Sequence, residues 1–157
     1  MARKPKIKVK KTFSFKKLAQ QFPTLTANML NMKGAMIHDA IQNGIDLQKD
    51  IDGNQYVEMS DTTIRIRTEQ GIKGKKLLHV TGKMRETKQT KATPAKLKYQ
   101  VQATTDYAAD HNEGTDTIPQ RKWFGIPKST RPGQPDAKKI DLAWAAALRH
   151  AWKKYGK

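Results

Sequence analysis

The sequence has no cysteine, only 7% aromatic residues, and fewer than half as many acidic as basic residues. Without cysteine it has neither a disulfide framework nor a thiolate metal site, which fits assembly in a reducing cytoplasm. No apolar run approaches the roughly 18 residues of a membrane span, so we expect no membrane contact. Hydrophobic residues make up 36% of the 157 positions, which predicts a modest core.

The net charge of +17 lies almost entirely in two segments. Residues 1–17 hold eight basic residues and no acid, and residues 71–100 hold nine against Glu86. Such runs commonly bind nucleic acid or acidic protein surfaces, and they often serve only as solvated segments. We expect residues 1–17 to be an arm attached to a single domain over 18–157. The arm's expected contacts with DNA or a protein partner come from Arg3, Lys4, Lys6, Lys8, Lys10 and Lys11.

Hydrophobic periodicity predicts one amphipathic helix near each end of the chain. In residues 22–44, apolar residues recur every three or four positions, with Pro23 in the first turn and Gly44 as the C-terminal cap. The second helix is predicted over about residues 136–155. Its apolar stripe consists of Ile140, Trp144, Leu148, Ala151, Trp152 and Tyr155.

Between the two helices the pattern changes to alternation. Residues 97–105 alternate apolar and polar side chains, which predicts a strand paired in a hairpin with the polar segment 84–92. Residues 61–70 fit a helix capped by Ser60 equally well as a strand, and the pattern does not decide between them. The predicted fold class is α+β, a small antiparallel sheet with a long β-hairpin packed against the N-terminal and C-terminal amphipathic helices.

No metal or cofactor site is predicted. Asp50, Asp52 and Asn54 have the opening spacing of a calcium loop, but Gln55 stands where glycine is required and no Glu closes the loop. An ordinary Asp-Gly turn is therefore expected there.

No enzymatic activity is predicted either. His111 lies close to Asp110 and Glu113, which is a pattern compatible with acid/base chemistry, but no nucleophile motif accompanies them. We therefore interpret His111 as a hydrogen-bonding residue of the turn before Gly114.

Residues 107–126, YAADHNEGTDTIPQRKWFGI, are the most informative stretch of the chain. Their glycines and proline specify the backbone path, including a short strand near 117–126. The cluster of Arg121, Trp123 and Phe124 suits a stacking surface for single-stranded nucleic acid, an interface anchor, or packing beneath the C-terminal helix. We expect one of the two rings in the core and the other at an interface.

Taken in order, five motifs resemble those of the tailed-bacteriophage virion morphogenesis family, whose members include tail-completion proteins. The resemblance covers about residues 20–155. The motifs are DGNQY at 52–56, the Ser/Thr-rich segment 60–63, LHVTGKMR at 78–85, YAADHNEG at 107–114, and IPQRKWFGI at 118–126.

The resemblance implies a non-enzymatic structural protein of the phage neck or tail-completion complex, located in the virion after assembly in the host bacterial cytoplasm. Such proteins form rings, usually six-fold, that cap the tail tube or join it to the portal and adaptor proteins of the head connector. The sequence leaves open whether this chain caps the tail, closes the head or joins both. Expected contacts with neighbouring copies or partners come from Arg85, Tyr107, His111, Arg121, Trp123 and Phe124.

The alternative function is that of a small basic nucleic-acid-binding protein. It would hold phosphates through the arm and the 72–98 hairpin, with strongly salt-dependent affinity. The basic segments carry few aromatic residues on which bases could stack, which favours the structural function.

Overall fold

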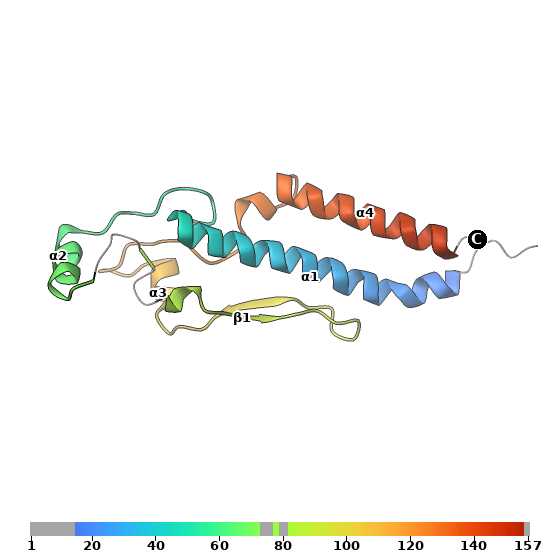
Figure 1. The fold of residues 1–157 in the computed structure, drawn as a ribbon, viewed down its shortest axis with the longest axis horizontal. Helices are drawn as coiled ribbons and strands as arrows, with labels where there is room; N and C mark the ends of the chain where they lie inside the picture. Colours follow the sequence, from blue (N-terminus) through green and yellow to red (C-terminus); the bar gives the residue numbers. More distant parts are fainter. Residues whose placement is uncertain (1–14, 73–76, 79–81, 156–157) are drawn as a thin grey trace, which may run out of the picture.

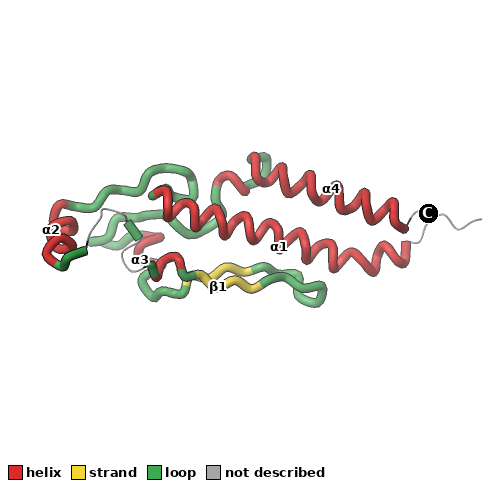
Figure 2. Tube along the Cα trace, in the orientation of Figure 1, coloured by secondary structure: helices red, strands yellow, loops and turns green. Residues whose placement is uncertain are grey.

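The computed structural model describes residues 15–72, 77–78 and 82–155, and one long helix, α1 (Phe15–Leu47), lies at its centre. Helix α4 (Pro135–Tyr155) packs along one side of α1, and a β-hairpin lies along the other side (Figure 1). Two short helices, α2 (Asp61–Glu69) and α3 (Ala108–Glu113), and most of the loops gather at the C-terminal end of α1 (Figure 2). This arrangement confirms the predicted α+β class. The six arm residues for which contacts were predicted, Arg3, Lys4, Lys6, Lys8, Lys10 and Lys11, lie outside the described residues.

The ends of α1 differ from the prediction at both termini. The helix begins at Phe15, so Pro23 lies inside it and not in its first turn. A proline has no N–H for the carbonyl one turn earlier, which bends a helix, and the N-terminal end of α1 is bent in Figure 1. At the other end the helix runs past Gly44 to Leu47. Gln48 then takes the left-handed conformation that ends it, with φ 59°.

The hairpin consists of β1 (Thr87–Thr90) and β2 (Gln100–Ala103), which pair antiparallel with Thr87 opposite Ala103. It confirms the predicted pairing, with shorter strands than expected. The predicted strand in 117–126 is wrong. The backbone N–H of Arg121 donates to the carbonyl of His111 at 2.8 Å, so this segment bonds to α3 and not to the sheet.

A row of polar residues on α1 binds the hairpin. Apolar periodicity does not reveal such a row. Asn31, His38, Gln42 and Asp46 recur at helical spacing on the face toward the hairpin. The His38 ring lies 2.9 Å from the Thr87 hydroxyl. The side chain of Gln42 donates to the carbonyl of Arg85, and Asp46 pairs with the Arg85 guanidinium at 3.0 Å. Gly34 lies within the same row, directly beneath the ring of Tyr99, where a side chain has no room.

We predict that Asn31→Ala lowers the free energy of unfolding by about 1–3 kcal/mol. The Asn31 amide donates to the Ala92 carbonyl at 3.0 Å and accepts from the Ala92 N–H at 2.7 Å, and Ala92 is buried, so both backbone groups lose their partner. Urea unfolding and amide exchange around Ala92 measure the effect. Asn28→Ala, at an exposed position of the same helix, is the control. Equal stability of the two variants would contradict a stabilising role for the two hydrogen bonds between Asn31 and Ala92.

Residues 61–70 form a helix, which the pattern had left undecided. The Ser60 hydroxyl accepts from the N–H of Thr63 at 3.3 Å, and Asp61 lies in the first turn. This capping supplies the partner that the free N–H groups of a helix start need. None of the residues of α2 is fully buried, and Ile66 is 43% exposed, so its alternating isoleucines do not mark a strand in a core.

The turn after α1 is an Asp-Gly turn, as predicted. Asp50 accepts from the N–H groups of Asp52 and Asn54 at 2.9 and 2.8 Å, and from the Asn54 amide at 3.1 Å. Its carboxylate therefore stabilises the chain reversal itself. In the described part of the chain, no three His, Asp or Glu side chains are grouped so that they could hold a metal ion.

We predict that Asp50→Asn lowers the free energy of unfolding by about 1 kcal/mol at neutral pH. Partial burial alone would raise the pKa of Asp50, but the bonds from Asn54 and Asp52 bring the pKa below its usual 3.8. The charged form therefore stabilises the fold above pH 3.8, and this stability is lost as pH falls through the lowered pKa. In urea unfolding across pH 2–7, the two proteins should converge at the acid end. Asp116→Asn, at an exposed position, is the control. A constant difference down to the lowest pH would contradict the assignment.

Candidate functional site

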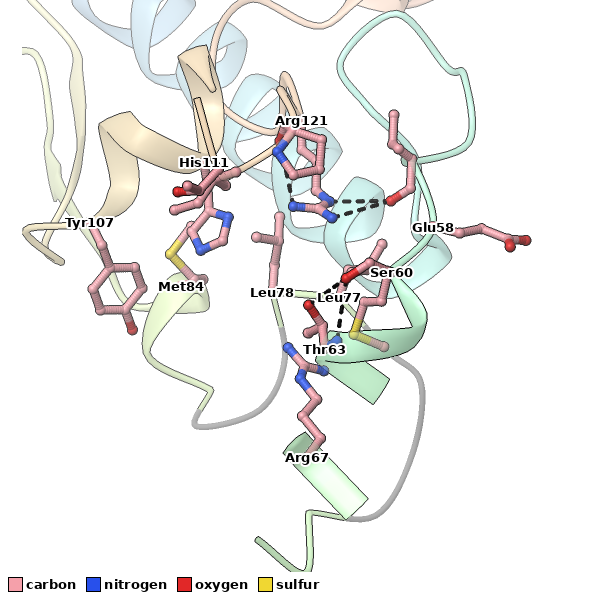
Figure 3. Close-up of a pocket in the computed structure, with 15 residues that line it drawn as sticks. Glu58, Ser60, Thr63, Arg67, Leu77, Leu78, Met84, Tyr107, His111 and Arg121 are labelled. Carbon is pink, nitrogen blue, oxygen red and sulfur yellow. Dashed lines mark hydrogen bonds between the residues drawn. The ribbon is translucent and has the colours of Figure 1, made fainter. Parts of the chain in front are cut away.

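A cavity of about 550 Å³ opens at the end of the molecule beyond α1, between α2, α3 and the loops beside them (Figure 3). Three of the six residues predicted to make subunit or partner contacts line it, Tyr107, His111 and Arg121. It is thus the place where the tertiary structure brings half of the predicted contact residues together. The full lining is Val57, Glu58, Met59, Ser60, Thr63, Arg67, Leu77, Leu78, Met84, Tyr107, His111, Thr117, Ile118, Pro119 and Arg121.

Arg121 is a buried cation, only 6% exposed, whose partners are carbonyl groups. Its Nε and Nη2 both donate to the carbonyl of Val57 at 3.3 Å, and Nη1 donates to that of Pro119 at 3.5 Å (Figure 3). These bonds are long for a guanidinium. Within the described residues, no carboxylate forms an ion pair with Arg121. Burial lowers the pKa of Arg121, and the charge of Arg67 lowers it further. Among the described residues, the charge of Arg121 is therefore not paired with a carboxylate.

His111 also lines the cavity. Its Nδ1 is buried and has no hydrogen-bond partner among the described residues. Burial lowers the pKa of the ring and Arg121 lowers it further, while the exposed Asp110 acts in the opposite direction. The prediction that His111 hydrogen-bonds within a turn is only half right. Its backbone carbonyl accepts from Arg121, but its side chain lies in α3 against the edge of Tyr107, with ring centres 6.0 Å apart.

The remaining wall of the cavity is mostly apolar. Leu77, Leu78 and Met84 belong to the main core cluster, and their surfaces form one side of the cavity. Glu58 is the one acidic residue of the lining, and its carboxylate points away from the two arginines in Figure 3. Sequence reasoning missed Arg67. If residues 61–70 form a helix, Arg67 lies on the same face as Ile64, three residues earlier. This spacing is the sequence signal that could have identified Arg67.

Trp123 and Phe124 lie behind the cavity wall and not in it. Trp123 is 1% exposed, and its Nε1 donates to the carbonyl of Ala108 at 3.2 Å. This confirms that one ring of the pair lies in the core. Phe124 is half-buried, packs against the same cluster, and meets Trp123 edge-on with ring centres 5.2 Å apart. A contact of Phe124 with another subunit stays a prediction, whereas Trp123 and Arg121 are buried within their own chain.

Arg85 lies outside the cavity, on the hairpin side of α1. Its guanidinium binds Asp46 and Gln42, and its side chain is 40% exposed. It therefore stabilises the hairpin within the chain, and its predicted contact with a partner remains untested. Tyr107 is 38% exposed at the cavity mouth, which leaves its ring accessible.

Charge is unevenly distributed along the long axis. Residues 104–120 carry four exposed acidic residues and no Lys or Arg, and they lie beside the cavity. The opposite half has no acid among residues 15–34 of α1, 91–98 of the hairpin loop and 145–155 of α4 (Figure 1). Its exposed basic residues are Lys16, Lys17, Lys33, Lys91, Lys96, Lys98, Arg149, Lys153 and Lys154.

Comparison with known families gives a match. The sequence model of the phage virion morphogenesis family matches residues 8–135, which is most of the chain. Neither a curated protein nor a solved structure matches the sequence. Among the described helices, none is long and apolar enough to cross a membrane.

Proposed function

The chain belongs to the phage virion morphogenesis family, and from this membership we propose that it is a structural protein of the neck or tail-completion complex. In this function it forms a ring that caps the tail tube or joins it to the head connector. The family match over residues 8–135 is the observation that carries the proposal. The expected partners are copies of itself, usually six, and the tail-tube, portal or adaptor proteins.

The charge distribution supports assembly into a ring. The acidic segment 104–120 at one end and the acid-free half at the other are complementary surfaces on the same molecule. When two different surfaces of identical copies meet, the contact is head-to-tail, and it closes into a ring if the rotation between copies allows. Complementary charge speeds encounter and fixes the register of such contacts.

The exposed apolar residues also support burial against other chains. Leu142 on α4 is 68% exposed and Trp152 is 55% exposed, while Leu47 at the end of α1 is 63% exposed. A small protein whose core lies mainly at one end leaves such side chains for an assembly to cover. The predicted contacts of Tyr107 and Phe124 lie at the acidic end, on the proposed contact surface.

The proposal is tested on purified full-length protein and on particles. Light scattering after gel filtration should give a mass several times 17.8 kDa at low salt and a smaller mass at high salt. Electron micrographs of the larger species should show rings. Phage lacking the gene should produce unfinished tails or unjoined heads and tails. Monomeric protein at every salt concentration, together with normal particles from the deletion, would refute the proposal.

Nucleic-acid binding is the second candidate, and the acid-free half of the molecule favours it. Nine exposed basic residues there could contact phosphates, in addition to the arm. Binding of duplex DNA would then weaken linearly on a log–log salt plot, with a slope of about −0.9 per phosphate contact. Absence of binding at low ionic strength would reject this candidate and leave the ring proposal intact.

A further inference from the structure

The outer face of α4 combines an exposed apolar patch with two cations. Its exposed residues recur at spacings of four, three and four positions, which places them on one side of a helix. They are Leu142, Ala146, Arg149 and Lys153. The buried residues Ile140 and Ala151 lie on the opposite side, which packs on α1. Because Leu142 is 68% exposed, the outer face is accessible to another molecule.

The exposed face of α3 has the opposite charge. Asp106, just before the helix, and Asp110 and Glu113 within it recur at spacings of four and three residues, and all three are exposed. These three residues are the acidic face of α3. Tyr107 lies next to them and is 38% exposed. Within the described residues, neither these carboxylates nor the two cations of the outer face of α4 form ion pairs.

The two faces lie on opposite sides of the molecule. Helices α3 and α4 flank α1 from different sides in Figure 1. One chain can therefore use both faces at once, each with a different copy, as a head-to-tail contact requires. A symmetric contact between two outer faces of α4 would instead bring Arg149 and Lys153 of each copy together, and like charges repel.

We propose that the outer face of α4 binds the acidic face of α3 of a second copy of this chain. Arg149 and Lys153 of one copy lie against the carboxylates of Asp110 and Glu113 of the other. Leu142 packs against the ring of Tyr107. The apolar contact removes surface from water, and the charge pairs fix the register. The contact rests on the ring function proposed above and names the two surfaces that join its copies.

Dimensions and composition favour a second copy over a nucleic acid. At 1.5 Å per residue, Leu142 and Arg149 lie about 10 Å apart along α4, and Tyr107 and Glu113 lie about 9 Å apart along α3. The apolar and the charged contacts can therefore form together when the two helices lie side by side. A phosphate backbone would match the cations but would leave Leu142 exposed.

The test uses two full-length variants, each with one face changed. The first combines Leu142→Asp with Arg149→Glu on α4, and the second combines Asp110→Lys with Glu113→Lys on α3. All four positions are exposed, so both variants should keep the circular dichroism of the unchanged protein. In analytical ultracentrifugation, each variant alone should associate at least about a hundredfold more weakly than the unchanged protein. An equimolar mixture should form pairs and no larger species, because each variant retains the face that the other needs.

Lys96→Glu is the control, because it reverses an exposed charge in the hairpin loop, away from both faces. It should change association by less than about threefold. If both variants assembled like the unchanged protein, this contact would be overturned and the ring proposal would stand. Loss of assembly in only one variant, or a mixture without pairs, would also overturn it. Duplex DNA bound by the unchanged protein but not by the first variant, with no pairs in the mixture, would assign the face to nucleic acid. An unchanged protein that stays monomeric would refute both proposals.

Discussion

Replacing Trp123 with alanine is expected to lower the free energy of unfolding by about 3–5 kcal/mol. The indole is 1% exposed and belongs to the cluster that joins Ile45 of α1 to Tyr56 and the hairpin end. Truncation would leave a large void and remove the hydrogen bond to the carbonyl of Ala108. For a protein of this size, such a loss is a large part of the total stability. Equilibrium urea unfolding followed by far-ultraviolet circular dichroism measures it.

Trp152→Ala is the matched control for this experiment. Trp152 is 55% exposed on α4, so its truncation leaves no buried void and should change stability by less than about 1 kcal/mol. The ratio of the two effects is informative because both changes remove the same atoms. Similar losses for both variants would show that Trp123 does not lie in the core of the folded chain.

Replacing Gly114 with alanine is expected to cost about 2–4 kcal/mol. Gly114 ends α3 with φ 82° and ψ 163°, a combination that essentially only glycine adopts. A Cβ atom there would also lie 2.9 Å from the backbone nitrogen of Gln120, so the backbone would have to move. Gln120 precedes Arg121, and the shift would therefore also disturb the cavity. Urea unfolding gives the cost, and the ring signals of His111 report the disturbance.

Gly133→Ala separates the two contributions. Gly133 has nearly the same φ, 81°, but no atom within 4 Å of the added Cβ. Its substitution should carry only the conformational cost, about 1–2 kcal/mol, partly offset by the less flexible unfolded chain. If the two variants lost equal stability, the close approach of Gln120 to Gly114 would not contribute.

Local chemistry was sufficient to predict several elements. The apolar periodicity of residues 22–44 and 136–155 predicted the two long helices, because one face of each has to leave water. The Asp-Gly turn at 50–54 and the pairing of β1 with β2 also depend on neighbouring residues or on simple alternation. The boundaries of α1 could not be predicted in this way. The chain turns back only at Gln48, which is not a glycine, so the residue type gave no signal for this helix end.

The site was predicted in its residue types more than in its arrangement. Tyr107, His111 and Arg121 were selected as contact residues, and all three line the cavity. Their partners were missed, since Arg67 and Leu78 are far away in the sequence and meet them only after folding. The polar row of α1 was missed for a similar reason. Asn31 and His38 look like an ordinary solvated helix face until the hairpin lies against them.

Four properties could therefore be predicted without the structure, namely the family, the two amphipathic helices, the hairpin and the excess of basic charge. These follow from motif order, periodicity and composition, which need no knowledge of distant contacts. The folded chain was needed to establish that Trp123 lies in the core and that residues 117–126 bond to α3. Folding also brings Lys91, Arg149 and their neighbours together in one half, away from the acidic segment 104–120. Burial and charge separation are properties of side chains brought together across long stretches of chain, and local patterns do not contain them.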